Sequence, residues 1–235
     1  MSVAPTRATD GGSLVDHAMH RVREHIRIHD LKVGDTLPGE GRFANDLGVS
    51  RAVMREAFGA LAALRLLDVG NGRRARVGAI DGSVMGRAID HAVATAQVSV
   101  AEVWDVRRTL ELRTAELAAV NRSDADAAAI MRHADAMRAA GDDLAEVTRH
   151  DIRFHQAIAQ AGGNGLFLQI VRSFEPLMTV AVPTAWQTRV THAQRENILH
   201  QHHEIADAIR HVDPARAALA MSEHFDASIG NLFGR

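Results

Sequence analysis

Residues 37–67 read LPGEGRFANDLGVSRAVMREAFGALAALRLL, and this stretch decides the fold of the first part of the chain. It predicts two short helices joined by a tight turn. The first helix covers residues 40–47, and a glycine and a valine then make the turn. Ser50 is the N-cap of a second helix that reaches about Arg65. Apolar side chains recur on the second helix at helical spacing and are expected to face inward: Val53, Ala57, Leu61 and Leu64.

Two arginines on the second helix lie away from that apolar stripe, because Arg51 and Arg55 are four residues apart and share a face. A capped helix with guanidiniums on its first turns, preceded by a helix and a turn, is how a helix-turn-helix presents itself to a major groove of DNA. Arginines on a helix are also common on a face that meets only solvent. The spacing alone leaves both interpretations open.

A small β-hairpin is predicted directly after these helices. Residues 66–70 form a short apolar run, and the pair Asn71 and Gly72 is a hairpin turn signal. Three cations lie at or near the tip: Arg73, Arg74 and Arg76. A cationic hairpin of this kind is typical of a wing, which contacts phosphates beside a recognition helix, so it favours DNA binding.

The residues quoted above resemble the winged helix-turn-helix of GntR-type bacterial transcription regulators. The shared features are a leucine-proline pair, a valine-serine-arginine cap and an arginine-glutamate-alanine segment, and the resemblance covers residues 14–77. It implies that Arg51 and Arg55 occupy DNA-contacting positions. The residues expected to contact DNA are Arg42, Ser50, Arg51, Arg55, Arg73 and Arg74.

The chain departs from the GntR pattern at several positions. Gly39 replaces a serine, and Gly41 replaces an arginine that contacts DNA in the family, with Arg42 one step further on. Arg65 stands where a glycine usually ends the recognition helix, and Arg74 stands where the wing usually has its glycine. These changes bear on which bases the protein prefers.

The composition is that of an ordinary globular protein, with 46% hydrophobic and 24% charged residues among 235. No apolar run is long enough to span a membrane, and no hydrophobic signal segment opens the chain, so we expect a cytoplasmic protein without a membrane partner. The absence of cysteine excludes disulfides and thiolate zinc fingers. Residues 1–77 hold 12 Lys+Arg against 9 Asp+Glu, whereas the remainder holds 15 against 20, which suits a DNA-facing domain joined to a regulatory one.

Four segments are expected in chain order. Residues 1–12 form a disordered arm, residues 13–78 form a winged helix-turn-helix of three helices and a hairpin, and residues 79–83 form a linker. Residues 84–235 form an all-α bundle of six or seven helices, so the fold is mainly α. We expect the fifth helix of the bundle to run from about Leu166 to Val182, where Pro183 stops it, with Trp186 in the loop that follows; an earlier kink at Pro176 is the alternative.

A second group of residues indicates a metal site in the helical bundle. Asp151 and His155 are four residues apart and share one helix face, and His202 and His224 lie on the apolar stripes of two later helices. A carboxylate and three imidazoles suit a divalent cation such as Zn²⁺, Ni²⁺ or Mn²⁺. Because the chain contains 14 histidines, some would also fall on apolar faces by chance and be ordinary core residues.

Residues 100–227 resemble the FadR C-terminal domain, or FCD, which follows many GntR-type heads. The shared residues are Val106, Arg107, Leu110, Glu111, Asp151, Phe154, His155, Gly163, Asn164, His202, Ile205, Ala208, Ile209, Asp213 and His224. The resemblance implies that Asp151, His155, His202 and His224 bind a metal beneath a cavity for a small organic acid. His203 is the nearest rival for the third ligand.

The resemblance also implies two residues that bind the effector. Arg107 would form a bidentate pair with its carboxylate, although a surface ion pair with Glu111 or Glu102 is the alternative. Asn164 matches a family position as well, but an asparagine between glycines is also a common helix-terminating residue.

These observations predict a ligand-responsive transcription regulator rather than an enzyme. Its homodimer would bind an inverted-repeat operator, and a small organic acid at the metal would change operator affinity, most often by relieving repression. Two alternatives remain. One is a metal-dependent hydrolase or lyase, since such ligand sets also activate water. The other is a sensor of the metal itself.

Overall fold

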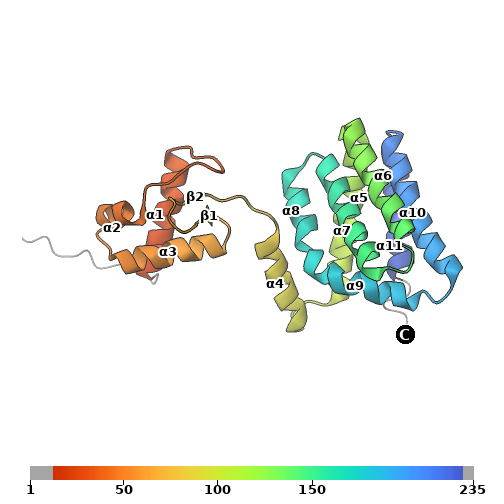
Figure 1. Cartoon of the computed structure of the whole chain (residues 1–235), viewed down its shortest axis with the longest axis horizontal. Coiled ribbons are helices and arrows are strands. Elements are labelled where there is room, and N and C mark those ends of the chain that lie inside the picture. Colours follow the sequence, from red (N-terminus) through yellow and green to blue (C-terminus); the bar gives the residue numbers. More distant parts are fainter. Residues whose placement is uncertain (1–12, 230–235) are drawn as a thin grey trace, which may run out of the picture. The chain divides into compact units, whose positions relative to one another are not determined.

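The computed structural model describes residues 13–229 (Figure 1). The arm expected at residues 1–12 lies outside them. The chain divides into two compact units between Val84 and Met85, and each unit has a hydrophobic core of its own. We call them the head and the body.

The head contains three helices and a two-stranded antiparallel sheet, as the sequence predicts. Its elements are α1 (Leu14–Ile28), α2 (Glu40–Leu47), α3 (Arg51–Ala63), β1 (Leu67–Asp68) and β2 (Arg76–Val77). In the sheet Leu67 lies opposite Val77. The core of the head is built from residues of all three helices and the hairpin, including Val22, Phe43, Phe58 and Leu67.

Local signals set the ends of α2 and α3. Gly48 ends α2 with a left-handed φ of 65°, which a glycine adopts without steric cost. The Ser50 side chain then accepts a hydrogen bond from the backbone N–H of Val53 and starts α3. The prediction that Leu64 faces inward is wrong: α3 ends at Ala63, and Leu64 is exposed.

The body is all-helical. Its helices are α4 (Ser83–Ala94), α5 (Val100–Asn121), α6 (Asp124–Ala140), α7 (Leu144–Ala161), α8 (Gly165–Ser173), α9 (Glu175–Thr188), α10 (His192–Arg210) and α11 (Pro214–Ile229). Helix α6 packs on α7 and α10, while α11 packs on α5 and α10 (Figure 1). The predicted mainly α fold, a winged helix-turn-helix followed by a helical bundle, is confirmed.

The helix expected from Leu166 to Val182 is instead two helices, α8 and α9, bent by 56° at their junction. Pro176 lies in the first turn of α9, where its missing N–H costs no hydrogen bond. Pro183 does not stop α9, which continues to Thr188. Trp186 therefore lies on a helix rather than in a loop, and its burial in the core of the body offsets the bond lost at the proline.

Within residues 13–229 no single helix has the length and apolar composition needed to cross a lipid bilayer. Only α8 and α9 taken together reach that length and composition.

Candidate metal and effector site

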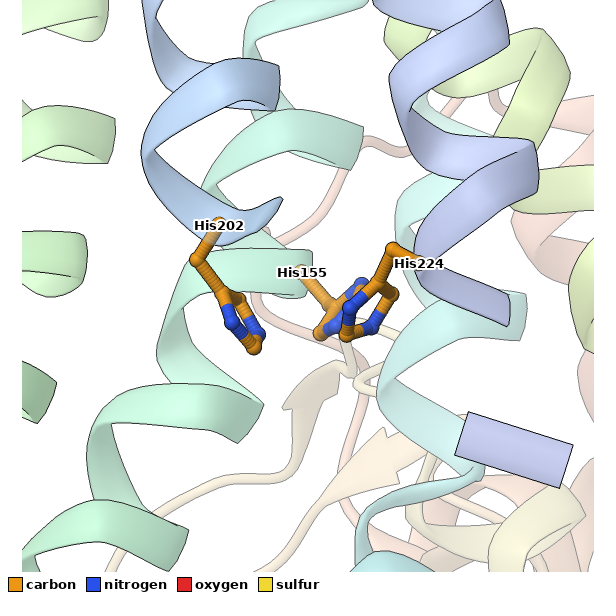
Figure 2. Close-up of side chains that lie close together, drawn as sticks. All are labelled: His155, His202 and His224. Atoms are coloured by element: carbon orange, nitrogen blue, oxygen red, sulfur yellow. The ribbon is translucent and has the colours of Figure 1, made fainter. Parts of the chain in front are cut away.

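Three helices of the body each contribute one histidine to a buried cluster. His155 comes from α7, His202 from α10 and His224 from α11, and their rings point toward one another (Figure 2). Each ring offers a nitrogen within 4.8 Å of the others, and all three side chains are buried. We call these residues the histidine cluster.

Asp151 reaches the cluster from one turn before His155 on α7. Its Oδ1 lies 3.2 Å from Nε2 of His202, while Nδ1 of His202 donates to the carbonyl of Ile198 at 2.8 Å. Burial alone would raise the pKa of Asp151, but the hydrogen bond with His202 and the nearby histidines hold it well below its ordinary value. Asp151 is therefore a carboxylate at the edge of the histidine cluster.

His155 is oriented from behind by Glu111. Nδ1 of His155 lies 2.5 Å from Oε2 of Glu111, which leaves Nε2 as the nitrogen open to the cluster. Burial would raise the pKa of Glu111, but Arg107 and His155 lower it below its ordinary value. A carboxylate behind a histidine is the usual support of a metal-ligating imidazole, because it fixes the ring and its tautomer. The sequence analysis did not assign this role to Glu111, since the contact joins α5 to α7.

Arg107 forms the ion pair with Glu111 that was its alternative interpretation, but the pair is buried and not on the surface. Its Nε donates to Oε1 of Glu111 at 2.7 Å, and both side chains are almost completely buried. Its guanidinium also lies 4.8 Å from the centroid of the Trp104 ring. Arg107 thus lines the site as predicted, but its charge is already balanced by Glu111.

His224 has a buried Nδ1 without a hydrogen-bond partner among the described residues. Burial, and then the neighbouring His202 and His155, hold the pKa of His224 well below its ordinary value, so the ring is neutral. A neutral imidazole with an unpaired buried nitrogen costs free energy unless something binds it. Three imidazoles beside a carboxylate form a borderline donor set that fits a divalent transition metal such as Zn²⁺, Ni²⁺ or Mn²⁺.

A cavity of about 40 Å³ adjoins the cluster, which is room for roughly three water molecules. Asp151, the three histidines and Arg107 line it, together with Trp104 and Arg189. Arg189, at the C-cap of α9, was missed in the sequence analysis because no local pattern distinguishes it. Its side chain is only 6% exposed.

Two other residues that the sequence offers as candidate ligands lie away from this site. Asn164, proposed as an effector ligand, caps α8 by accepting hydrogen bonds from the backbone N–H groups of Leu166 and Phe167. It is exposed and borders a different hollow from the one beside the histidine cluster. His203, the rival ligand, points to Asp135 at 3.0 Å and does not belong to the cluster.

The residues predicted to contact DNA lie on an exposed surface of the head. Ser50, Arg51 and Arg55 are exposed at the start of α3, with Arg55 Nε 3.9 Å from Oε2 of Glu40. Arg42 is exposed on α2, with its Nε 3.8 Å from Oδ2 of Asp46. In the wing, Arg74 is exposed, and Arg73 donates to Asp68 at 2.7 Å.

Arg65 explains one departure from the GntR pattern. It adopts a φ of 58°, the left-handed conformation that the usual glycine would take. The N–H of Leu66 then bonds the carbonyl of Leu61, and the N–H of Arg65 bonds that of Ala62. The helix therefore ends in the same way without the glycine, at the cost of some backbone strain.

Comparison with known proteins supports the same division. Residues 14–77 match the gntR family of bacterial regulatory proteins, and residues 102–227 match the FCD domain. The HTH-type transcriptional repressor NanR of Salmonella arizonae is 27% identical over 247 residues, covering 97% of this chain and 93% of that protein. NanR of Salmonella newport is 29% identical over 211 residues, covering 88% and 80%. The solved structure of a Streptococcus agalactiae GntR protein shares the fold, with a TM-score of 0.65 at 24% identity, and covers 91% of this chain and 98% of that one.

A GntR head followed by an FCD domain is the organisation of a regulator, which rules against the hydrolase or lyase alternative. The FCD match alone covers more than half of the chain. This chain belongs to the GntR family of DNA-binding bacterial regulators, in the FadR-type group whose members carry an FCD domain.

Proposed function

We propose that this protein is a transcriptional repressor whose operator affinity is controlled by a small organic acid bound at a divalent metal centre. Asp151, His155, His202 and His224 would hold the ion. Repression is suggested by the NanR relatives, which are repressors by name.

The contact between Asp151 and His202 carries the metal assignment. Nδ1 of His202 lies 2.8 Å from the carbonyl of Ile198, so Nε2 is the nitrogen turned toward Oδ1 of Asp151, 3.2 Å away. Two ligands of one ion with bonds of about 2.0–2.2 Å are separated by roughly this distance.

A bound ion would join α7, α10 and α11 at one point and offer its remaining coordination positions to an oxygen of the effector. The cavity of about 40 Å³ is smaller than most organic acids, so the effector would enter only when the helices around it move. That requirement links effector binding to a change in the body.

In the head, Arg51 and Arg55 on α3 would enter the major groove, with Arg42 and Ser50 beside them and Arg73 and Arg74 on the phosphates. We propose a homodimer whose two heads bind an inverted repeat. A coupling free energy of roughly 1–3 kcal/mol between effector and operator would change affinity by about 5- to 150-fold.

The test is fluorescence anisotropy with the DNA upstream of the protein's own gene, using metal-loaded and chelator-treated protein. We expect specific binding, and we expect an organic acid from a screened panel to weaken it only when the metal is present. Failure of every acid to change the affinity of the metal-loaded protein would reject effector control.

A second candidate is a sensor of the metal itself, and the small volume of the cavity favours it. In that case chelation alone would release the operator, and adding the metal back would restore binding without any organic ligand.

A further inference from the structure

Arg189 is a buried arginine without an ion-pair partner among residues 13–229. Its side chain lines the same cavity as Asp151. The carboxylate of Asp151 attracts the guanidinium of Arg189 from a distance longer than that of a salt bridge. A guanidinium that is largely removed from water without an anion beside it is costly, because desolvation is not repaid by a close opposite charge. An anion bound beside Arg189 would compensate this cost.

The surroundings hold Arg189 in place. Nε of Arg195 donates to the backbone carbonyl of Arg189 at 3.1 Å, and the Arg195 guanidinium lies 5.7 Å from the centroid of the Trp186 ring. Arg195 in turn pairs with Asp142 at 2.8 Å. The junction between α9 and α10 is thus fixed from outside, while the Arg189 side chain itself is left for the cavity.

A second polar group on the cavity wall is also without a partner. Nε1 of Trp104 is buried and forms no hydrogen bond within the described part of the chain. A buried N–H of this kind is normally satisfied, so it indicates a missing acceptor atom. Trp104 thus adds a polar group without an acceptor to the residues around the cavity, while Arg189 supplies the positive charge.

Charge balance suggests how acidic that ligand is. Arg107 is neutralised by Glu111 at 2.7 Å, and Arg189 and Asp151 together add no net charge. The histidine cluster adds none when its rings are neutral, so a divalent ion would leave the site with about two uncompensated positive charges. A ligand with two negative charges would restore neutrality.

Building on the proposed function, we infer that the effector is a dianion, with one acidic group at the histidine cluster and a second at Arg189. A dicarboxylate of three to five carbons is the simplest compound of this class. Arg107 is less suited to the second acid, because a ligand would have to displace Glu111 from it.

The probes are pairs of acids with equal carbon number: malonate with propionate, succinate with butyrate, and glutarate with pentanoate. Their binding to the full-length, metal-loaded protein is measured by calorimetry, and metal content is measured before and after. We expect at least one dianion to bind about 10- to 100-fold more tightly than its matched monoanion, the range of one charge-assisted hydrogen-bonded pair.

Two variants assign that difference to Arg189. Arg189→Gln is expected to bind the dianion no better than the monoanion, with unchanged metal content, while Arg189→Lys keeps part of the preference. Because the substitution to glutamine removes an unpaired buried charge, the ligand-free variant should unfold at the same or a higher temperature. Arg153→Gln, which changes an exposed arginine on α7, is the matched control and should behave as the wild type.

Equal affinity for both members of every pair, or full dianion preference in Arg189→Gln, overturns the inference. If monoanions bind equally well and only with metal present, the proposed function stands and the dianion assignment fails. If no acid of either class binds, or the protein takes up no metal, the proposed function fails as well.

Discussion

Asp151 on α7 and His202 on α10 meet across the body with 3.2 Å between Oδ1 and Nε2, although they are 51 residues apart in the chain. Two ligands of one cation with bonds of about 2.0–2.2 Å lie at roughly this separation. This contact makes the histidine cluster a candidate metal centre rather than a group of core histidines that happen to be neighbours.

Loss of one ligand should remove the metal. His202→Ala is expected to lower the metal content from about one ion per chain to near zero. Chelation of the wild type should lower the free energy of unfolding by about 3–4 kcal/mol at ion concentrations of roughly 100–1,000 times Kd. Metal content is measured by elemental mass spectrometry and stability by urea unfolding.

The matched control is His203→Ala, one residue along α10, where the ring contacts Asp135 instead. That variant should keep its metal. Full metal content in His202→Ala, or loss in His203→Ala, would contradict the assignment.

The stability of the body should fall below about pH 6.5 through a second pair of histidines. Arg149 donates to Nε2 of His150 at 3.0 Å, so Nδ1 of His150 carries the proton and donates to Nδ1 of His133 at 3.1 Å. Burial, and then the charges of His150 and Arg132, lower the pKa of His133 from its ordinary value of 6.5. Glu146, whose Oε2 lies 3.7 Å from Nε2 of His150, is the acidic group beside the pair.

Since the folded pKa of His133 lies below the unfolded one, the unfolded chain takes up the proton first as the pH falls. The stabilising contact is complete above pH 6.5 and is lost as the pH drops toward the folded pKa. In His133→Gln the loss of unfolding free energy at low pH should be smaller by about 1 kcal/mol, the net contribution of one hydrogen bond. The free energy of unfolding of the metal-free protein is measured by urea unfolding at pH 7.5 and pH 5.5, with the exposed His200→Gln as the control. If stability falls between these pH values as much in His133→Gln as in the wild type, the role of the pair is rejected.

Removal of Arg51 and Arg55 together should abolish specific operator binding. Each guanidinium that contacts a base contributes about 1–3 kcal/mol, so the double alanine variant should bind at least about 30-fold more weakly. Anisotropy over a range of salt concentrations should also show a shallower salt dependence. The control is Arg21→Ala, on α1 and paired with Glu24, and undiminished binding by the double variant would reject α3 as the recognition helix.

Val212→Gly should stabilise the protein. Val212 follows the C-cap of α10 with a φ of 57°, which is strained for a β-branched residue, and its side chain is exposed. Relief of this strain, less the added entropy of glycine in the unfolded chain, is worth about 0.5–1 kcal/mol. Val190→Gly, at an exposed position without a positive φ, should destabilise instead, and thermal unfolding of both variants compares them.

The sequence by itself determined the head and most helix ends, because their signals are local. The Ser50 cap, the left-handed Gly48 and the turn at Gly72 each act within a few residues of the chain. Apolar periodicity also placed His202, rather than His203, on the buried face of α10. The bend between α8 and α9 lies beside Pro176, the alternative kink, whereas the continuation of α9 past Pro183 was not predicted because Trp186 is held by the core of the body and not by its neighbours in the chain.

Only the tertiary structure decided how the site is completed. The position of Glu111 behind His155 and the unpaired Arg189 depend on contacts between α5, α7 and the junction of α9 with α10. The ion pair between Arg107 and Glu111 joins residues four apart on α5, and the fold decides only that it is buried. Burial is a property of packed helices, and no spacing within one helix encodes it. Asn164 differs from these residues, because its cap on α8 is a local feature of the chain and a helix-end role was the alternative to an effector ligand.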